Sequence, residues 1–327
     1  MAKPRPAQGV VQGDAVVVKD EAQANRLHNR GYLGAPQPGN TLRLTLTEAS
    51  WAVAEGRLVV QQDGKGLGLP TLLDFAANRD LTAAAQYAVY RDLRERGLVV
   101  RHVAAGLAAW PRGKGIDGEP DFVVRPHSED DGIPATDLWV SNGMVHAIVD
   151  ADGAVTYFRA TTASPEGTTV EPRFPKTAGQ RIGGQVLVTD PTACQAMTAA
   201  FVGAAGLGGV VLSRAEAAWL EGRGILDVAG GADDGAAPTV AATLASLRAR
   251  GIVVRSGFRF GTHLRGYRGD PDAGHAEWIV TCCNADDELP WRLLARAIRV
   301  AHGVRKTFLV ALAAADVQYV ALAWFKP

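Results

Sequence analysis

The chain has 327 residues, with 34 basic and 34 acidic side chains and no formal net charge. This length suits about two domains of ordinary size. The composition, 47% hydrophobic and 21% charged, is that of a soluble globular protein. No uninterrupted apolar run reaches the roughly 18 residues of a membrane span, and Met1–Gln8 lacks the apolar core of a secretory signal. We therefore expect a cytoplasmic protein with no membrane partner.

The three cysteines, Cys194 and the adjacent Cys282 and Cys283, fit neither a disulfide framework nor the spacing of a zinc site. His263 and His302 do not complete a metal-ligand pattern with them. The sequence thus predicts a reducing compartment, no metal and no cofactor. A neutral net charge also means that any nucleic-acid surface must come from local clusters of basic residues.

The chain repeats itself. The segments LRERGLVVR (Leu93–Arg101) and LRARGIVVR (Leu247–Arg255) are identical at seven of nine positions, with an offset of 154. Two further pairs of blocks keep the same order, at offsets of 168 and 170: EASW with EAAW, and VVVKD with VLVTD. Similarity that keeps its order along the chain indicates a tandem duplication. The Pro-rich segment Ser164–Arg181 reads as a linker, so we expect a first repeat at 1–163, a linker at 164–182 and a second repeat at 183–327.

The expected elements follow the same order in each repeat. A short strand leads to a helical stretch, then to a helix N-capped by Thr47 or Ser213 that ends near Gly56 or Gly224 and buries Trp51 or Trp219. Another helix ends in an Arg-x-Arg-Gly stop, and β-branched runs follow it. The second repeat closes with a helix and two strands, expected at Pro290–His302, Thr307–Ala311 and Val317–Trp324. This order predicts an α/β (α+β) fold in each repeat.

Three short motifs occur in order in the second repeat. They are Tyr267-Arg268-Gly269, then His275 shortly before Trp278, then Val304-Arg305-Lys306 between a helix and a strand. Together with the Glu-Ala-x-Trp and Leu-Arg-x-Arg-Gly blocks, they make the whole chain resemble the archaeal tRNA-intron endonuclease family. The resemblance implies an N-terminal α+β subdomain and a C-terminal mixed-sheet, nuclease-like subdomain in each repeat, the catalytic one at about 252–327.

The activity that the resemblance implies is metal-independent excision of introns from precursor tRNA at bulge-helix-bulge junctions, with 2′,3′-cyclic phosphate and 5′-hydroxyl ends. In the implied catalytic set, Tyr267 assists deprotonation of the 2′-hydroxyl, His275 protonates the leaving oxygen, and Lys306 stabilises the charged phosphorane. Histidine can exchange protons near neutral pH, and lysine offers a compact positive charge. Tyrosine ionises near pH 10, so Tyr267 either is assisted by Arg268 and Lys306 or mainly orients the hydroxyl.

The first repeat lacks this set. At an offset of 156 around these motifs, Tyr267 corresponds to Pro111 and His275 to Glu119, and at an offset of 162 near the end of the repeats Lys306 corresponds to Met144. The three residues are missing together while framework residues persist, which indicates that the first repeat is an inactive, structural unit. Separately, each of the three has a plainer explanation as a turn, surface or solvated residue.

The same family resemblance gives residues that bind RNA or hold an assembly together. Arg299, two helical turns before Lys306, is expected to stack on a bulged base, and Arg268 and Trp324 are further candidates to contact RNA. A solvated helix face is the alternative for Arg299. The acidic pair Asp130 and Asp131 is expected to dock on a partner chain. The apolar Val317–Trp324 would expose a sheet edge unless it were covered, so we expect a homodimer.

Two other classes of protein remain as alternatives. A non-catalytic RNA-binding or structural subunit of a splicing endonuclease complex should lack the set in both repeats, whereas this chain keeps it in the second. A metal-dependent nuclease should carry clustered carboxylates near Lys306, and the sequence shows none. The sequence does not predict whether the protein accepts only strict bulge-helix-bulge junctions or also relaxed ones.

Overall fold

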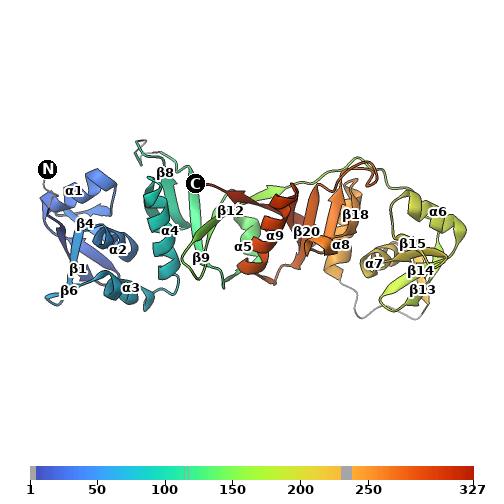
Figure 1. The fold of residues 1–327 in the computed structure, drawn as a ribbon, viewed down its shortest axis with the longest axis horizontal. Coiled ribbons are helices and arrows are strands. Elements are labelled where there is room, and N and C mark those ends of the chain that lie inside the picture. Colours follow the sequence, from blue (N-terminus) through green and yellow to red (C-terminus); the bar gives the residue numbers. More distant parts are fainter. Residues whose placement is uncertain (1–4, 114, 117, 230–237) are drawn as a thin grey trace. The chain divides into compact units, whose positions relative to one another are not determined.

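The computed structural model describes residues 5–113, 115, 116, 118–229 and 238–327 (Figure 1). Met1–Pro4, part of the N-terminal segment considered above, lies outside the described residues. The chain forms two compact units: residues 1–131, 143–159 and 325–327 make the first, and residues 132–142 and 160–324 make the second. No helix in the described part of the chain is both long and apolar enough to cross a bilayer.

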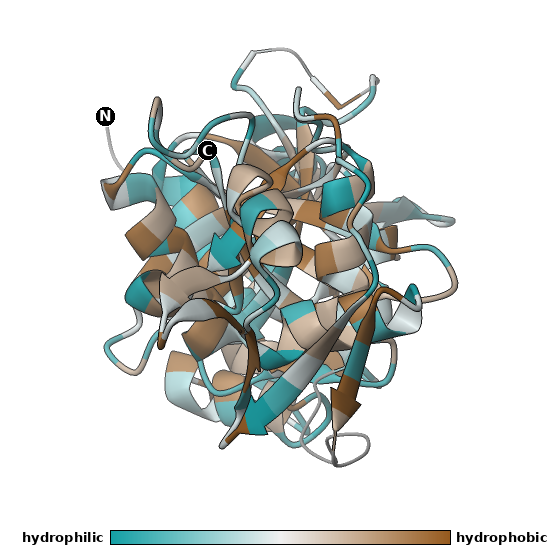
Figure 2. Ribbon diagram, turned by 90° about the vertical axis from the view of Figure 1, so that its right-hand side faces the viewer, coloured by the Kyte–Doolittle hydropathy of each residue, from teal (hydrophilic) through white to brown (hydrophobic). Residues whose placement is uncertain are grey.

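The first unit begins with an α/β lobe built on a mixed six-stranded sheet, in the order β3-β4-β2-β1-β5-β6. Its central strand β1 pairs antiparallel with β2 and parallel with β5. Buried and exposed residues alternate along β1. Apolar and polar segments likewise alternate along the ribbon elements that face the viewer in Figure 2. The elements are β1 Ala7–Gln12, β2 Ala15–Val18, α1 Glu21–Gly31, β3 Ala35–Gln37, β4 Thr41–Thr45, α2 Leu46–Ala54, β5 Leu58–Gln62, β6 Lys65–Leu67 and α3 Leu69–Ala77.

The second unit contains a matching lobe with the strand order β15-β16-β14-β13-β17. Here β13, the counterpart of β1, pairs antiparallel with β14 and parallel with β17. The strand β13 (Thr177–Ile182) lies inside the segment expected to be a linker. The sequence does not predict this strand because TAGQRI has too little apolar alternation. The elements are β13 Thr177–Ile182, β14 Gln185–Val188, α6 Pro191–Ala199, β15 Ala204–Gly206, β16 Gly209–Leu212, α7 Arg214–Gly222 and β17 Leu226–Ala229.

The helices α2 and α7 begin with the same capping box. The hydroxyls of Thr45 and Ser213 accept from the backbone three residues on, and Glu48 and Glu216 bond back to the cap. The expectation that Thr47 caps α2 is therefore wrong: Thr47 is buried inside the first turn, and the hydroxyl that can reach Glu48 belongs to Thr45. Beyond both helices, Gly56 and Gly224 adopt φ of 65° and 66°, a left-handed conformation that glycine adopts without strain.

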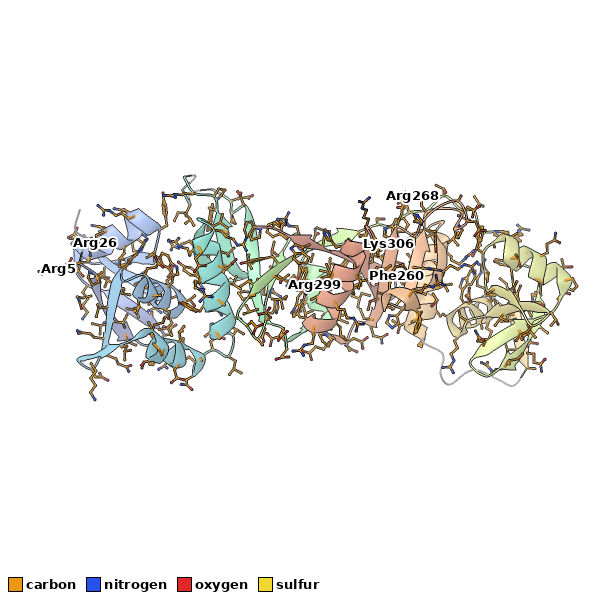
Figure 3. The ribbon with its side chains drawn as sticks, in the orientation of Figure 1. Arg5, Arg26, Phe260, Arg268, Arg299 and Lys306 are labelled. Atoms are coloured by element: carbon orange, nitrogen blue, oxygen red, sulfur yellow. The ribbon has the colours of Figure 1, made fainter. Side chains whose placement is uncertain are left out.

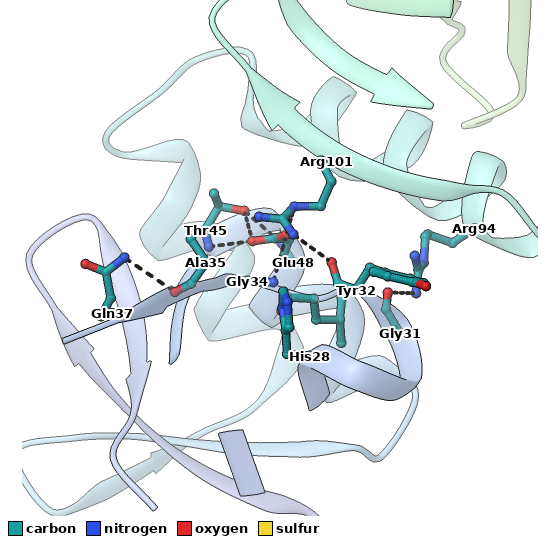
Figure 4. A network of polar contacts seen from close by, with 11 residues as sticks. His28, Gly31, Tyr32, Gly34, Ala35, Gln37, Thr45, Glu48, Arg94 and Arg101 are labelled. Atoms are coloured by element: carbon teal, nitrogen blue, oxygen red, sulfur yellow. Dashed lines mark hydrogen bonds and ion pairs between the residues drawn. The ribbon is translucent and has the colours of Figure 1, made fainter. Parts of the chain in front are cut away.

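A buried carboxylate ties the first lobe to the strand β7 (Figure 4). Glu48 is 3% exposed, accepts hydrogen bonds from the amides of Gly34 and Thr45, and lies 4.0 Å from the guanidinium of Arg101. Arg101 in turn donates to the carbonyl of Tyr32. A buried charge must be paired and hydrogen-bonded to be tolerated, and Glu48 meets both conditions within one unit.

A second, mixed sheet follows each lobe. In the first unit the strands of this sheet run in the order β7-β8-β9-β11-β12, and α4 packs on β7, β9 and β11. In the second unit the strands run in the order β18-β19-β20-β22-β23, and α8 and α9 pack on the sheet. These elements are α4 Ala83–Glu95, β7 Val99–Val103, β8 Gly106–Trp110, β9 Phe122–Ser128, β11 Val145–Val149 and β12 Val155–Ala163, then α8 Pro238–Ala249, β18 Val253–Ser256, β19 Leu264–Tyr267, β20 Trp278–Asn284, α9 Trp291–Gly303, β22 Thr307–Ala313 and β23 Gln318–Phe325. The predicted α/β class, with an α+β subdomain and a mixed-sheet subdomain in each repeat, is confirmed.

The segment Gly132–Asn142 of the first repeat belongs to the second compact unit. It holds β10 (Gly132–Pro134) and α5 (Ala135–Val140), and β10 pairs antiparallel with β21 (Glu288–Pro290). In this register Ile133 lies opposite Leu289, its own counterpart at the offset of 156. The acidic residues just before each strand therefore occupy equivalent turns, in which Asp131 and Asp287 each accept from a backbone amide three residues earlier.

A large apolar cluster lies in each unit, and both of these clusters include residues of the lobe and of the sheet that follows it. Trp51 and Trp219, which the sequence placed on buried helix faces, are both 6% exposed. Trp51 packs edge-on against Tyr90, and Trp219 packs edge-on against Phe174. Each lobe therefore shares its core with its neighbouring sheet, which holds the sheet ends in a defined position.

Candidate active site

Tyr267, His275 and Lys306 flank the same end of the second unit's sheet. Tyr267 is the last residue of β19, His275 lies three residues before β20, and Lys306 directly precedes β22. The register joins these ends, because Trp278 of β20 pairs with Gly266 of β19 and with Thr307 of β22. The three residues that the sequence grouped by motif are thus brought to one edge by strand pairing.

Lys306 is held beside the loop that carries His275. Its ammonium donates to the carbonyl of Ala276 at 2.6 Å and lies 5.7 Å from the ring centre of Phe260. Arg305, just before it, adopts φ of 53°, which turns the chain sharply from α9 into β22. Lys306 is half-buried while His275 is exposed, so a positive charge lies beside the loop that carries an exposed histidine.

Tyr267 faces a hollow rather than the core. It is half-buried and helps to line a cavity of about 860 Å³ in the second unit, together with Arg255, His263 and Arg265. The guanidinium of Arg265 lies 5.6 Å from the ring centre of Tyr267. Sequence reasoning missed Arg265, although the period-2 alternation of a strand places residues 265 and 267 on one face.

Arg268 is engaged by a carboxylate. Its guanidinium makes a two-pronged ion pair with Glu277, at 2.9 Å for the closest atoms, and lies 5.3 Å from the ring centre of Trp278. Figure 3 labels it with Phe260, Arg299 and Lys306. The cation over the ring of Tyr267 is therefore Arg265, and Arg268 clamps the loop of His275 through Glu277. No sequence pattern predicts this ion pair, because it depends on how the loop folds back.

Arg299 and Trp324 lie together on the second unit. The guanidinium of Arg299 is 5.8 Å from the ring centre of Trp324, and the ring of His302 is 6.1 Å from it. Arg299 and His302 are exposed, and Trp324 is 42% exposed. A cation and an aromatic face are thus available side by side, which is a suitable surface for an unstacked base.

The remaining histidine and cysteine candidates are used in the fold. His263 accepts from the amide of Cys282 through Nδ1, and burial lowers its pKa. Burial raises the pKa of the Cys282 and Cys283 thiols to about 12. Among the described residues, no group of three or more His, Cys, Asp or Glu side chains is arranged to hold a metal ion.

The first unit shows what stands at the corresponding sheet edge. Val99 and Val253 are counterparts, and they pair with Trp110 and Tyr267, respectively. The position equivalent to Tyr267 is therefore Trp110, so the alignment with Pro111 is wrong by one residue. The cause is that the loop between β8 and β9 is one residue longer than the loop between β19 and β20. A comparison at a single offset cannot account for this extra residue.

The position equivalent to Lys306 also shifts. In the parallel pairs β9–β11 and β20–β22, Val124 lies opposite Val145 and its counterpart Val280 lies opposite Leu309. This register makes the offset 164, so Lys306 corresponds to Asn142 and the alignment with Met144 is wrong by two residues. Glu119 remains the residue that corresponds to His275, because Glu119 lies three residues before β9 and His275 lies three residues before β20. Trp110, Glu119 and Asn142 still provide no tyrosine, histidine or lysine.

Two family models match this chain. The model of the tRNA intron endonuclease catalytic C-terminal domain matches residues 241–319, and that of the N-terminal domain matches residues 7–73. A tRNA-splicing endonuclease from Haloarcula marismortui is 33% identical over 92% of this chain and 93% of its own length. This chain belongs to the tRNA intron endonuclease family. Similar proteins of the same name occur in Methanosarcina acetivorans, at 31% identity over 92% of this chain and 94% of the relative, and Natronomonas pharaonis, at 32% over 93% and 95%.

The family match agrees with the geometry. The part of the chain that matches the catalytic domain, residues 241–319, contains Tyr267, His275 and Lys306. The N-terminal-domain match covers the lobe of the first repeat. The relatives match nearly their whole length, so they share the two-repeat extent of this chain.

Proposed function

We propose that this protein excises introns from precursor tRNA at bulge-helix-bulge junctions, as an endoribonuclease that leaves 2′,3′-cyclic phosphate and 5′-hydroxyl ends. The observation that carries the proposal is the meeting of Tyr267, His275 and Lys306 at one sheet edge of the second unit. Membership of the tRNA intron endonuclease family supports the substrate class.

In the proposed reaction the ribose 2′-oxygen attacks the adjacent phosphorus, and the bond from phosphorus to the 5′-oxygen breaks. Tyr267 takes or orients the 2′-hydroxyl proton, and His275 gives a proton to the leaving 5′-oxygen. Lys306 stabilises the negative charge that gathers on the phosphorane oxygens, the kind of preorganised electrostatic help that contributes most to such reactions. Base, acid and charge are then all supplied by side chains, so the proposal requires no metal.

We assign recognition of the junction to Arg299 and Trp324, whose guanidinium and ring lie 5.8 Å apart and can hold an unstacked base. Arg268 is assigned an indirect role, in which its ion pair with Glu277 positions the loop that carries His275 beside the RNA. Arg299, Trp324 and Arg268 all lie on the repeat that carries Tyr267, His275 and Lys306.

We further propose a homodimer. One chain carries one catalytic set, whereas a bulge-helix-bulge has two cleavage points, so a two-fold pair of chains supplies one site for each. Asp130 and Asp131, in the turn before β10, are the proposed docking residues. The end of β23 gives this proposal no support, because Phe325 packs against Phe122 and Arg159 of the same chain. Light scattering tests it: a mass near 34.4 kDa refutes the dimer, and about twice that mass supports it.

The decisive experiment for the activity is incubation with an intron-containing precursor tRNA in EDTA, followed by analysis of the product ends. We expect two cuts per intron, cyclic phosphate at each 3′ end and a free 5′-hydroxyl. Cleavage that stops in EDTA would overturn the metal-independent mechanism. Binding without any cleavage would instead identify a non-catalytic RNA-binding subunit.

A further inference from the structure

Four arginines gather around one hollow on the lobe of the first repeat. Arg5, Arg26, Arg30 and Arg57 line a cavity of about 450 Å³ together with Leu27, Glu55 and Gly56. With one carboxylate among four guanidinium groups, the lining carries a net charge of +3 (4 − 1). Figure 3 labels Arg5 and Arg26 near each other at this end of the ribbon.

These arginines converge from three separate segments. Arg26 and Arg30 are four residues apart on α1 and so share a helix face, Arg5 precedes β1, and Arg57 precedes β5. Arg26 donates to the carbonyl of Arg5 at 2.9 Å, and Arg57 lies 5.0 Å from the ring centre of Trp51. Within the described residues, no ion pair joins any of the four to a carboxylate. Their charges are held together without being neutralised.

The lobe of the second repeat shows that the fold does not require this cluster. The amides of Ala7 and Thr177 bond to the carbonyls of Arg57 and Ile225, which makes Arg57 and Ile225 counterparts. By the same correspondence Arg26 matches Ala196 on α6, and Arg5 matches Pro175. At the end of this helix Ala199 occupies the place of Arg30, because Phe201 has the positive φ of Tyr32. Glu55 matches Arg223, whose charge is paired with Glu171. The same backbone is thus built with alanine, proline and isoleucine where the first lobe has four arginines.

Clustering four like charges opposes folding, because guanidinium groups repel one another and gain little as isolated surface groups. A ligand with several negative oxygens reverses this balance, and arginine's planar fork matches phosphate geometry. We propose that this arginine pocket binds backbone phosphates of the substrate RNA outside the cleavage junctions. The inference rests on the proposed function for its ligand, precursor tRNA, whose body extends beyond the junctions that the catalytic repeat cleaves.

The test compares two RNAs, a full-length precursor tRNA and a minimal bulge-helix-bulge duplex without the tRNA body. Arg26→Ala combined with Arg30→Ala introduces the residues that the second lobe carries at these positions, so folding should be kept. We expect the affinity for the full-length precursor to fall about tenfold or more, since hydrogen bonds to charged groups are lost. The slope of log affinity against log salt should become shallower by about 1–2. Affinity for the minimal duplex and its rate of cleavage should stay unchanged.

Lys19→Ala combined with Lys65→Ala is the matched control, because it removes two exposed positive charges from the same unit away from the pocket. Unchanged binding of the precursor by the arginine variant overturns the proposal, as does an equal loss with the lysine control or an equal loss on both RNAs. Cleavage of the minimal duplex by the wild-type chain is scored separately. If the wild type cleaves neither RNA, the proposed activity fails, while an arginine-dependent affinity for the precursor still supports the pocket.

Discussion

The two repeats have the same scaffold but different side chains where chemistry or binding is proposed. Both have a lobe with a central strand pair, a capping-box helix with a buried tryptophan, and a mixed sheet with a helix packed on it. At the sheet edge, the second repeat has Tyr267, His275 and Lys306 where the first has Trp110, Glu119 and Asn142. The contacts needed for folding are thus shared by both repeats, whereas the side chains at the proposed functional positions differ.

The preserved contacts are specific. Glu48 and Glu216 each accept from a glycine amide and from the helix cap. Arg101 and Arg255, equivalent in the Arg-Gly blocks, donate to backbone carbonyls of their own lobes, Tyr32 and Gly203. The guanidinium of Arg94 lies 4.5 Å from the ring centre of Trp51, and that of its counterpart Arg248 lies 5.0 Å from the ring centre of Trp219. These groups join lobe to sheet in both repeats, so replacing them should damage either repeat.

A further difference lies in the sheet cores. In the first unit His127 and His146 contact each other, with 3.1 Å between Nε2 and Nδ1. Their counterparts in the second unit are Cys283 and Val310, both buried. Burial lowers the pKa of His127 to about 4 and that of His146 to about 3, helped for His146 by the neighbouring His127 and Arg125. Only the first unit therefore has a buried, titratable pair at this place in the described sheets.

The largest difference in cleavage rate is expected between the substitution of His275 and the substitution of its counterpart Glu119. His275→Ala should slow cleavage of precursor tRNA by about 10²–10⁴-fold, because the leaving oxygen loses its proton donor. The side chain is exposed, so the melting temperature and RNA affinity should remain close to those of the wild type. Glu119→Ala should cleave at the wild-type rate. Single-turnover rates decide, and an equally inactive, folded Glu119→Ala would contradict the assignment of one active repeat.

Lys306 and Asn142 give the second contrast. Lys306→Ala should lower the single-turnover rate by about 10²–10³-fold, since one preorganised charge is removed from the phosphorane. Lys306→Arg, which keeps the charge, should recover part of this loss, whereas Asn142→Ala should have no effect on the rate. Failure of arginine to recover any activity, with RNA affinity intact, would indicate that the bond to Ala276 matters more than the charge.

Acid should weaken the first unit through its histidine pair. Both histidines have folded-state pKa values below the ordinary 6.5, so the unfolded chain binds protons first as pH falls. Stability is then full above about pH 6.5 and falls between that pH and about 4, by up to about 1.4 kcal/mol per pH unit for each histidine. Urea unfolding at pH 7.5 and pH 5 measures it. His127→Cys with His146→Val, the second-repeat residues, should show a smaller difference between the two pH values.

The His127→Cys and His146→Val comparison isolates the pair, because His102 and His263, whose pKa values burial also lowers, stay the same in both proteins. Asp131 opposes the shift of His127 and Arg125 adds to it. If the double variant lost as much stability on acidification as the wild type, the pair would not be the source of the acid sensitivity.

The smallest effect is expected at the two capping-box glutamates. Glu48→Ala should lower the free energy of unfolding by about 1–3 kcal/mol, because it leaves the amides of Gly34 and Thr45 without their acceptor and Arg101 without its countercharge. Glu216 is less buried than Glu48, so Glu216→Ala should lower the free energy of unfolding by about 0.5–2 kcal/mol, the ordinary value of a lost cap. Urea unfolding monitored by circular dichroism gives both values. A larger loss from Glu216→Ala than from Glu48→Ala would show that burial does not set the difference.

The features that depend on local patterns could be predicted from the amino-acid sequence. The duplication, the helix stops at Gly56, Gly97, Gly224 and Gly251, and the buried tryptophans follow from short-range spacing and from the left-handed conformations that glycine adopts. The order of the Tyr, His and Lys motifs likewise depends only on the chain. It indicated the family, and the comparisons with relatives confirm that indication.

Tertiary structure alone decided which residues face one another. Trp110 and Asn142 replace Pro111 and Met144 as counterparts because strand register, set by hydrogen bonds between distant segments, absorbs loop residues that a linear comparison miscounts. Arg268 meets Glu277 only when its loop folds back. The arginine pocket needs three segments of one lobe to converge. Contacts between residues far apart in the chain depend on the packing of the sheets and helices, which no local pattern encodes.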